Sequence, residues 1–88
     1  MTLLGMDIEQ VEQLAASMTQ HGQQIDDAAR VLTTQIDGTH WLGQDNQTFR
    51  QDWDSIYRVQ LNNIVQALNE RSTHLKQEAQ QQQQASGN

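Results

Sequence analysis

The residues able to carry chemistry are few, and their spacing brings no catalytic set together. His21, His40 and His74 lie far apart in the sequence, whereas a metal site needs three or four convergent ligands. Two carboxylate clusters stand out, Asp26-Asp27 and Asp52-Trp53-Asp54, but neighbouring positions on a helix do not face one another. The chain contains no Cys and no glycine loop of the phosphate-binding type. We therefore expect no metal, no cofactor and no enzymatic activity.

The remaining candidates are aromatic and lie at mid-chain, where Trp41, Leu42 and Gly43 are followed by Phe49 and Trp53. A Trp between two helices can cover the corner with a large apolar area while its indole N–H reaches a carbonyl or water. A Gly two residues later can adopt a positive φ or let the backbone pass close to the ring. Two interpretations stay open: Trp41 only closes the corner, or it also forms part of a cleft that a partner recognises.

Two long amphipathic helices would position these residues. The chain has no Pro, and the abundant Gln, together with Leu, Ala and Glu, favours helix. Asp7 is a good N-cap. After it, apolar residues recur with helical spacing as far as Ile36, while Val31 falls off that face and is expected to be exposed. Gly22 either weakens this helix or allows a close helix approach.

A turn signal, Asp37-Gly38, ends the first pattern, and Gly38 suits a left-handed helix cap. Gly43 or Asp45 could cap a second helix. Its apolar residues are Phe49, Trp53, Ile56, Tyr57, Leu61, Ile64, Val65, Leu68 and Leu75. We expect one domain over residues 1–80, with helices at about 7–37 and 45–79, a turn at about 38–44, and a flexible Gln-rich tail at 81–88.

The predicted fold is all-α: a two-helix antiparallel hairpin that dimerises into a four-helix bundle. A short link forces the helices to run antiparallel. Both apolar stripes are wider than one neighbouring helix can cover, and an exposed apolar strip usually marks a partner surface. The expected dimer interface consists of Val11, Met18, Ile25, Leu32, Leu61, Ile64, Leu68 and Leu75.

Charge and hydropathy exclude other classes of partner. The net charge is −6, and the five basic residues are dispersed, whereas nucleic-acid binding requires clustered Lys and Arg. No stretch approaches the roughly 20 apolar residues of a membrane span. The segment from Met1 to Met6 is shorter than a signal peptide. We expect no nucleic-acid binding and no membrane insertion, and any export would follow a route that does not use a signal peptide.

The combination of Trp41-Leu42-Gly43 between two helices of similar length with Phe49 and Trp53 resembles the WXG-100 family of type VII secretion systems. The resemblance covers Ile8 to about Leu75. It implies a helical hairpin that pairs with itself or with a related WXG-type hairpin, and homodimerisation is the first expectation. It also implies a secretion ATPase as a further partner, and synthesis in the cytoplasm followed by secretion or display at the cell surface.

Some members of that family carry an export signal after the second helix, in which a Tyr is followed four residues later by Asp or Glu. The nearest match here pairs His74 with Glu78. The acidic position fits, but His replaces Tyr, so a partner bearing the full signal could carry the chain. The alternative function is that of an intracellular helical adaptor or chaperone that is not itself exported.

Overall fold

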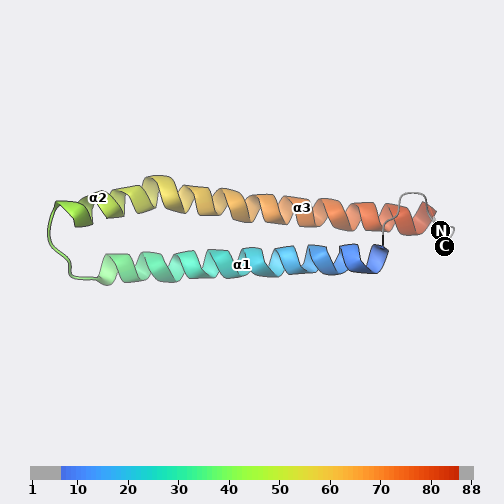
Figure 1. Ribbon diagram of the computed structural model, residues 1–88, viewed down its shortest axis with the longest axis horizontal. Helices are drawn as coiled ribbons and strands as arrows, with labels where there is room; N and C mark the ends of the chain where they lie inside the picture. Colours follow the sequence, from blue (N-terminus) through green and yellow to red (C-terminus); the bar gives the residue numbers. More distant parts are fainter. Residues whose placement is uncertain (1–6, 86–88) are drawn as a thin grey trace.

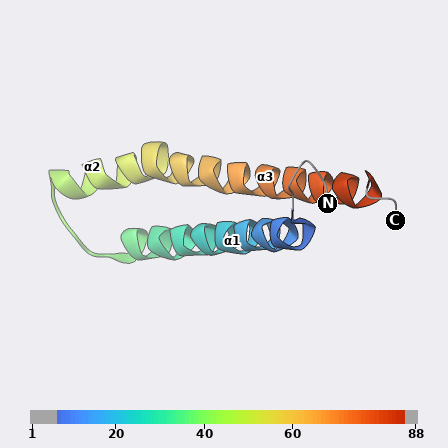
Figure 2. The same cartoon turned by 45° about the vertical axis from the view of Figure 1, so that its right-hand side comes forward.

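The chain is an all-helical hairpin in which one long helix lies antiparallel to a second helical arm (Figure 1). The computed structural model describes residues 7–85. Helix α1 (Ile8–Gly38) forms the first arm, and helices α2 (Gln44–Asp52) and α3 (Arg58–Ala85) form the second. The arms stay side by side when the view is turned (Figure 2). The hairpin measures 65 × 17 × 14 Å, so only a thin core can form between its arms.

The ends of α1 match one prediction and contradict another. Asp7 is the N-cap: its Oδ1 accepts a hydrogen bond from the backbone N–H of Gln10 at 3.0 Å. The prediction of a left-handed cap at Gly38 is wrong, because Gly38 is the last residue of α1 and Thr39 follows with φ −85° and ψ 126°. The N–H of Thr39 bonds the carbonyl of Ile36 at 3.4 Å, so the chain leaves the helix in an extended conformation.

The second arm is interrupted, whereas the sequence predicted one continuous helix from about 45 to 79. A π-helical turn, η1 (Trp53–Tyr57), separates α2 from α3, and the N–H of Arg58 bonds the carbonyl of Trp53, five residues earlier. A π turn inserts one extra residue into a helix. The positions that face α1 before the π turn are therefore shifted by one residue from those that face it afterwards. Ile56 and Tyr57, which were expected on the apolar face, are 43% and 44% exposed.

The end of α3 also differs from expectation, because the helix continues to Ala85, past the predicted end at 79. Gln is a good helix former, and the last part of α3 extends past the start of α1 (Figure 1). Gln82 in this part is 7% exposed. The predicted flexible tail at 81–88 therefore begins as helix. Its last three residues and the segment from Met1 to Met6 lie outside the described residues.

The seam between the arms alternates small and large side chains. In α1 the small residues Ala15, Gly22 and Ala29 recur every seven residues and are buried. Ser72 and Ala79 do the same in α3. A Cβ added at Gly22 would lie 3.7 Å from Cβ of Leu68, so a small residue of one helix faces a large one of the other. This spacing is a two-helix heptad seam.

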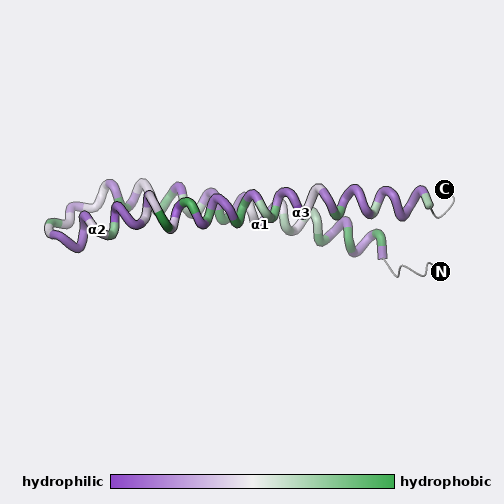
Figure 3. Tube along the Cα trace, turned by 90° about the horizontal axis from the view of Figure 1, so that it is seen from above, coloured by the Kyte–Doolittle hydropathy of each residue, from purple (hydrophilic) through white to green (hydrophobic). Residues whose placement is uncertain are grey.

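The core is correspondingly small: Trp53, which is 8% exposed, is the one large apolar residue that is buried in the described part of the chain. Coloured by hydropathy, the arms show apolar segments among polar ones, and the C-terminal part of α3 is largely hydrophilic (Figure 3). None of the helices within residues 7–85 combines the length and the apolar character that a bilayer span requires.

Candidate protein-interaction site

An aromatic corner closes the hairpin. The ring centroids of Trp41 and Phe49 lie 6.1 Å apart at an interplanar angle of 43°, a separation typical of interacting aromatic pairs. Trp41 is 43% exposed and Phe49 37% exposed, whereas Trp53 is buried. All three line a cavity of about 320 Å³. Its other lining residues are Leu32, Gln35, Ile36 and Thr39.

Hydrogen bonds to α1 fix the orientation of Trp53. Its indole Nε1–H donates to Oγ1 of Thr33 at 2.8 Å, and the Thr33 hydroxyl donates in turn to the carbonyl of Ala29 at 2.8 Å. The π turn contributes to this arrangement. Without it, the residue seven positions before Leu61 would face α1, and that residue is Asp54, not Trp53. The extra residue thus brings the aromatic ring into the seam.

The connection from Thr39 to Gly43 is tied to α2 by polar side chains. Nη2 of Arg50 donates to the carbonyl of Thr39 at 3.0 Å, and Nδ2 of Asn46 donates to the carbonyl of Trp41. Gly43 is the N-cap of α2, with φ 123° and ψ 173°. This positive φ was one of the two predicted roles of Gly43, and it strains any residue that carries a Cβ. The aromatic corner therefore rests on a defined backbone.

Polar contacts between the arms recur along one side of the hairpin. The hydroxyl of Ser72 bonds the carbonyl of Ala15 at 2.7 Å, and Oγ1 of Thr19 lies 2.7 Å from Oγ of Ser72. Asp26 lies 2.6 Å from Nη2 of Arg30 and 3.7 Å from Nη2 of Arg58. We call this the polar side. Its residues are Glu12, Thr19, Asp26, Thr33, Asn62, Asn69 and Lys76.

The opposite side is apolar, for a geometric reason. Two antiparallel helices are related by a local two-fold axis perpendicular to the plane of the pair, so equivalent heptad positions of both helices lie on the same side. The large seam residues, such as Met18 and Leu68, therefore share one side with the residues that directly precede the small seam residues, such as Leu14 before Ala15. We call this the apolar side. Its apolar residues are Val11, Leu14, Met18, Ile25, Ala28, Leu32, Leu61, Ile64, Leu68 and Leu75.

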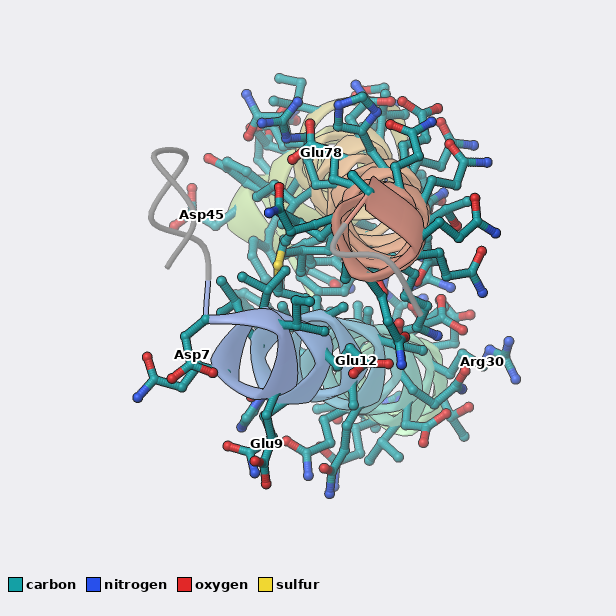
Figure 4. All side chains as sticks on the ribbon, turned by 90° about the vertical axis from the view of Figure 1, so that its right-hand side faces the viewer. Asp7, Glu9, Glu12, Arg30, Asp45 and Glu78 are labelled. Carbon is teal, nitrogen blue, oxygen red and sulfur yellow. The ribbon has the colours of Figure 1, made fainter. Side chains whose placement is uncertain are left out.

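A view along the hairpin agrees with this division (Figure 4). Glu12, which shares a heptad position with Thr19, points from α1 to the same side as Arg30, whereas Glu78 points from α3 toward the other. Glu78 directly precedes the small seam residue Ala79, which places it on the apolar side.

All eight residues of the predicted dimer interface lie on the apolar side, but their exposure differs. Leu32 and Ile64 are 45% and 48% exposed. The other six are half-buried already within one hairpin: Val11, Met18, Ile25, Leu61, Leu68 and Leu75. Leu14, which the sequence prediction omitted, is 52% exposed on the same side. The apolar side thus has partly covered residues at its centre and exposed residues along its edges.

The acidic residues in the middle of the hairpin lie away from the apolar side. The acidic residues of α1 occupy the polar side or the outer surface: they are Glu9, Glu12, Asp26, Asp27 and Asp37. On α3, Glu70 lies on the outer surface and Glu78 on the apolar side, and Figure 4 shows Asp7 and Asp45, near the two ends of the hairpin, on the same side as Glu78. The acidic residues in the body of α1 therefore do not face a second apolar surface docking there.

The two residues of the degenerate export signal form a local pair. Nε2 of His74 lies 2.6 Å from Oε1 of Glu78, and their side chains are 53% and 42% exposed. The contact is an ion pair when the imidazole is protonated. Both residues are open to solvent, one helical turn apart on α3, so a partner could reach them.

The aromatic corner has a mainly apolar chemical character. Among residues 7–85 no group of three or more His, Asp and Glu side chains lies close enough to hold a metal ion. The cavity at the aromatic corner has mainly apolar walls, and no charged side chain is among its lining residues. Such a surface can hold an apolar side chain.

The chain was compared with protein-family models, curated proteins and solved structures, and no match was found. The fold and the candidate site therefore rest on this chain's own residues.

Sequence reasoning identified the large apolar residues but missed those that bring the arms together. Close approach was one of the two predicted roles of Gly22, but its row with Ala15 and Ala29, Ser72 as the buried link, and Thr33 as the partner of Trp53 were not recognised. The seven-residue recurrence of Ala15, Gly22 and Ala29 was visible in the sequence and could have indicated the seam, because close helix pairs need small residues at such positions.

Proposed function

We propose that this protein acts by assembly: the apolar side of its hairpin packs against the apolar side of a second helical hairpin to form a four-helix bundle. The observation that carries the proposal is the one-sided distribution of apolar surface. Leu14, Leu32 and Ile64 are each about half exposed and share one side of a thin hairpin. Contiguous exposed apolar surface of this kind marks protein-interaction sites.

Energetic reasoning supports the same proposal. The seam is built partly from Ala, Gly and Ser, which bury little apolar area, whereas domains of this size have little stability to spare. Complete burial of a Leu or Ile side chain contributes about 1.5–3 kcal/mol. Half-exposed residues on two hairpins would add a part of that amount each, which makes pairing a source of stability as well as of function.

The biological setting that we propose is type VII secretion, with the chain as a WXG-100-type substrate or component. Support comes from Trp41, Leu42 and Gly43 in the connection between the arms and from Trp41 packing near Phe49. A related hairpin or a second copy would be the partner, and a secretion ATPase could engage the exposed His74 and Glu78. The chain would then be made in the cytoplasm and exported without a signal peptide, and it would not act as an enzyme.

Light scattering coupled to size-exclusion chromatography tests the assembly. The variants Leu14→Asp and Ile64→Asp place a charge on the apolar side at exposed positions, so we expect a folded monomer where the parent chain dimerises. Leu61→Asp is a poorer test, because Leu61 is half-buried within one hairpin and its replacement also weakens the fold.

Val59→Asp is the matched control. Val59 is 46% exposed on the same helix as Ile64, but its heptad position lies away from the apolar side. We expect Val59→Asp to leave the dimer intact. A parent chain that stays monomeric at high concentration, alone and with its genomic neighbour, would contradict the proposal.

A second candidate function is that of an intracellular adaptor or chaperone, which the cavity at the aromatic corner favours. Its walls include Trp41, Phe49 and Trp53, and such a cleft can accept an apolar side chain of a client. Localisation separates the two functions. Presence of the protein in culture filtrate without lysis supports export, whereas retention in cells with a bound cytosolic client supports the adaptor.

A further inference from the structure

Arg71 is an isolated cation on the apolar side. It belongs to the heptad row of Ile64 and Glu78 and is exposed. Within the described chain, Arg30 and Arg58 contact Asp26, and the guanidinium of Arg50 donates to a backbone carbonyl. Arg71 has no ion-pair partner among residues 7–85. A cation in an apolar surface weakens docking unless the partner supplies an opposite charge.

Arg71 also lies close to the midpoint of the hairpin. Its neighbour Ser72 contacts Thr19, and Leu68 faces Gly22, so Arg71 lies near the level of residues 19–21 of α1. The middle of α1 (Ile8–Gly38) is residue 23. At 1.5 Å per residue, Arg71 is thus about 5 Å from the midpoint along the axis.

Symmetry determines what Arg71 would meet in a homodimer whose apolar sides face each other. The two-fold axis must lie in the interface, either along the hairpin or across it. With the axis along the hairpin, residues at the same position along the long axis lie opposite each other. Arg71 then faces the part of the partner copy that contains His21 and Arg71. Glu78 of that copy is about 10 Å further along the axis.

With the axis across the hairpin, the copies run head to tail. Arg71 then faces the region of Ile64 of the partner copy, with Ala67 at its outer edge, and Glu78 of that copy lies roughly 20 Å away along the axis. The acidic residues that Figure 4 places on this side, Asp7, Asp45 and Glu78, lie toward the ends of the hairpin, so neither arrangement brings one of them to Arg71. The apolar side matches a second copy in hydropathy but not in charge at its centre.

We infer that Arg71 selects the partner: the preferred occupant of the apolar side is a different helical hairpin that presents a carboxylate near the midpoint of its own apolar stripe. Self-pairing is the weaker alternative. This inference rests on the proposed function and adds the chemistry of the partner. Polar residues within apolar helical interfaces commonly set partner choice at a cost in affinity.

Two altered copies of this chain can serve as acidic partners. One carries His21→Glu with Arg71→Gln, and the other carries Ala67→Glu with Arg71→Gln. The carboxylate at position 21 faces Arg71 of an unaltered chain in the axis-along arrangement. The carboxylate at position 67 lies at the outer edge of the apolar side, one helical turn from Ile64, where it flanks Arg71 in the head-to-tail arrangement. Both altered positions are exposed, so circular dichroism should show unchanged helicity. Each probe is mixed with the unaltered chain at low salt, and the pairing constants are measured by native mass spectrometry and analytical ultracentrifugation.

We expect one probe to pair with the unaltered chain roughly three- to tenfold more tightly than that chain pairs with itself. The gain should disappear when the unaltered chain is replaced by Arg71→Gln. That single variant should also self-associate more tightly than the unaltered chain. Lys76→Gln, which removes a cation from the polar side, is the matched control and should change neither constant.

The possible failures are distinguishable. If the chains pair but neither probe is preferred, or if Arg71→Gln self-associates no better than the unaltered chain, Arg71 does not select the partner while the assembly proposal stands. If the unaltered chain, Arg71→Gln and both mixtures all remain monomeric, the proposed assembly is overturned together with this inference.

Discussion

The two sides of the hairpin differ in the kind of contact that they make across the seam between the arms. On the polar side, Ser72 and Thr33 connect the arms through hydrogen bonds to Ala15 and Trp53, and Asp26 lies near Arg58. On the apolar side, large residues meet at the seam while Leu14 and Ile64 remain exposed along its edges. Directional contacts thus specify how the arms of one chain align, whereas non-directional apolar contact is left for a second chain.

Replacement of Trp53 is expected to have the largest effect on the comparison. Trp53→Ala removes the largest buried side chain and the N–H partner of Thr33, and should lower the free energy of unfolding by about 3–5 kcal/mol. Urea unfolding followed by circular dichroism at low protein concentration measures the loss within one hairpin. Phe49→Ala is the control: Phe49 is 37% exposed and its loss should cost clearly less. Equal losses would show that the polar side does not depend on Trp53.

Ser72→Leu tests how closely the arms must approach. Ser72 is 2% exposed and bonded to Ala15, so a larger side chain should push the helices apart and lower the free energy of unfolding by about 1–3 kcal/mol. Thermal unfolding by calorimetry would measure the change. Thr73→Leu, at the neighbouring exposed position, should leave stability nearly unchanged. An unaffected Ser72→Leu variant would mean that the seam tolerates large residues on both helices.

Gly22→Ala should act in the opposite direction. The added Cβ would lie 3.7 Å from Leu68, an ordinary contact distance, and Ala is favoured over Gly inside a helix by about 0.8–1 kcal/mol. We expect a corresponding rise in the unfolding free energy, measured by urea titration. A decrease would show that the seam requires a closer approach at Gly22 than the structure indicates. Gly43→Ala is the contrasting variant, because φ 123° makes it destabilising.

Deletion of Ser55 should have the smallest effect. Ser55 is exposed within the π turn, and removing one residue there converts the turn to α-helix while keeping Trp53 and Arg58 on the seam. We expect an unfolding midpoint that is unchanged or slightly higher. Deletion of Asn63, inside α3, is the control. It should disrupt folding, because the residues on one side of the deletion would be rotated by about 100° and their seam residues would no longer face α1. Similar damage from both deletions would argue that the π turn is required.

The sequence predicted the main features because strong local signals encode them. Helical periodicity indicated two arms, Asp7 was predicted as a cap, and Gly43 was one of the two residues predicted to begin the second arm. Val31 was expected to be exposed and is 56% exposed. The eight residues proposed for the interface share one side of the hairpin, although their role in a dimer stays a prediction.

The remaining features depend on contacts between segments distant in sequence. In a continuous helix, Trp53, Ile56 and Tyr57 could all lie on one face, so the sequence alone does not indicate the π turn. The hydrogen bond from Trp53 to Thr33 favours the π turn only when α1 is packed against this arm. A hydropathy pattern assigns apolar residues such as Leu61 to the contact between helices and polar residues such as Ser72 to the surface. It therefore identifies the apolar side but not the row of small residues where the arms pack most closely. The helix through Ala85 was missed because a Gln run has no apolar period, although its helix propensity is high.

The elongated shape has a consequence for how assembly is detected. The radius of gyration is 19.5 Å, whereas a compact domain of this length would have about 12 Å. A single rod elutes early in gel filtration and can be mistaken for an oligomer. Two rods that join lengthwise along one side would gain thickness but little length, so small-angle scattering should report a larger cross-section at nearly constant maximum dimension.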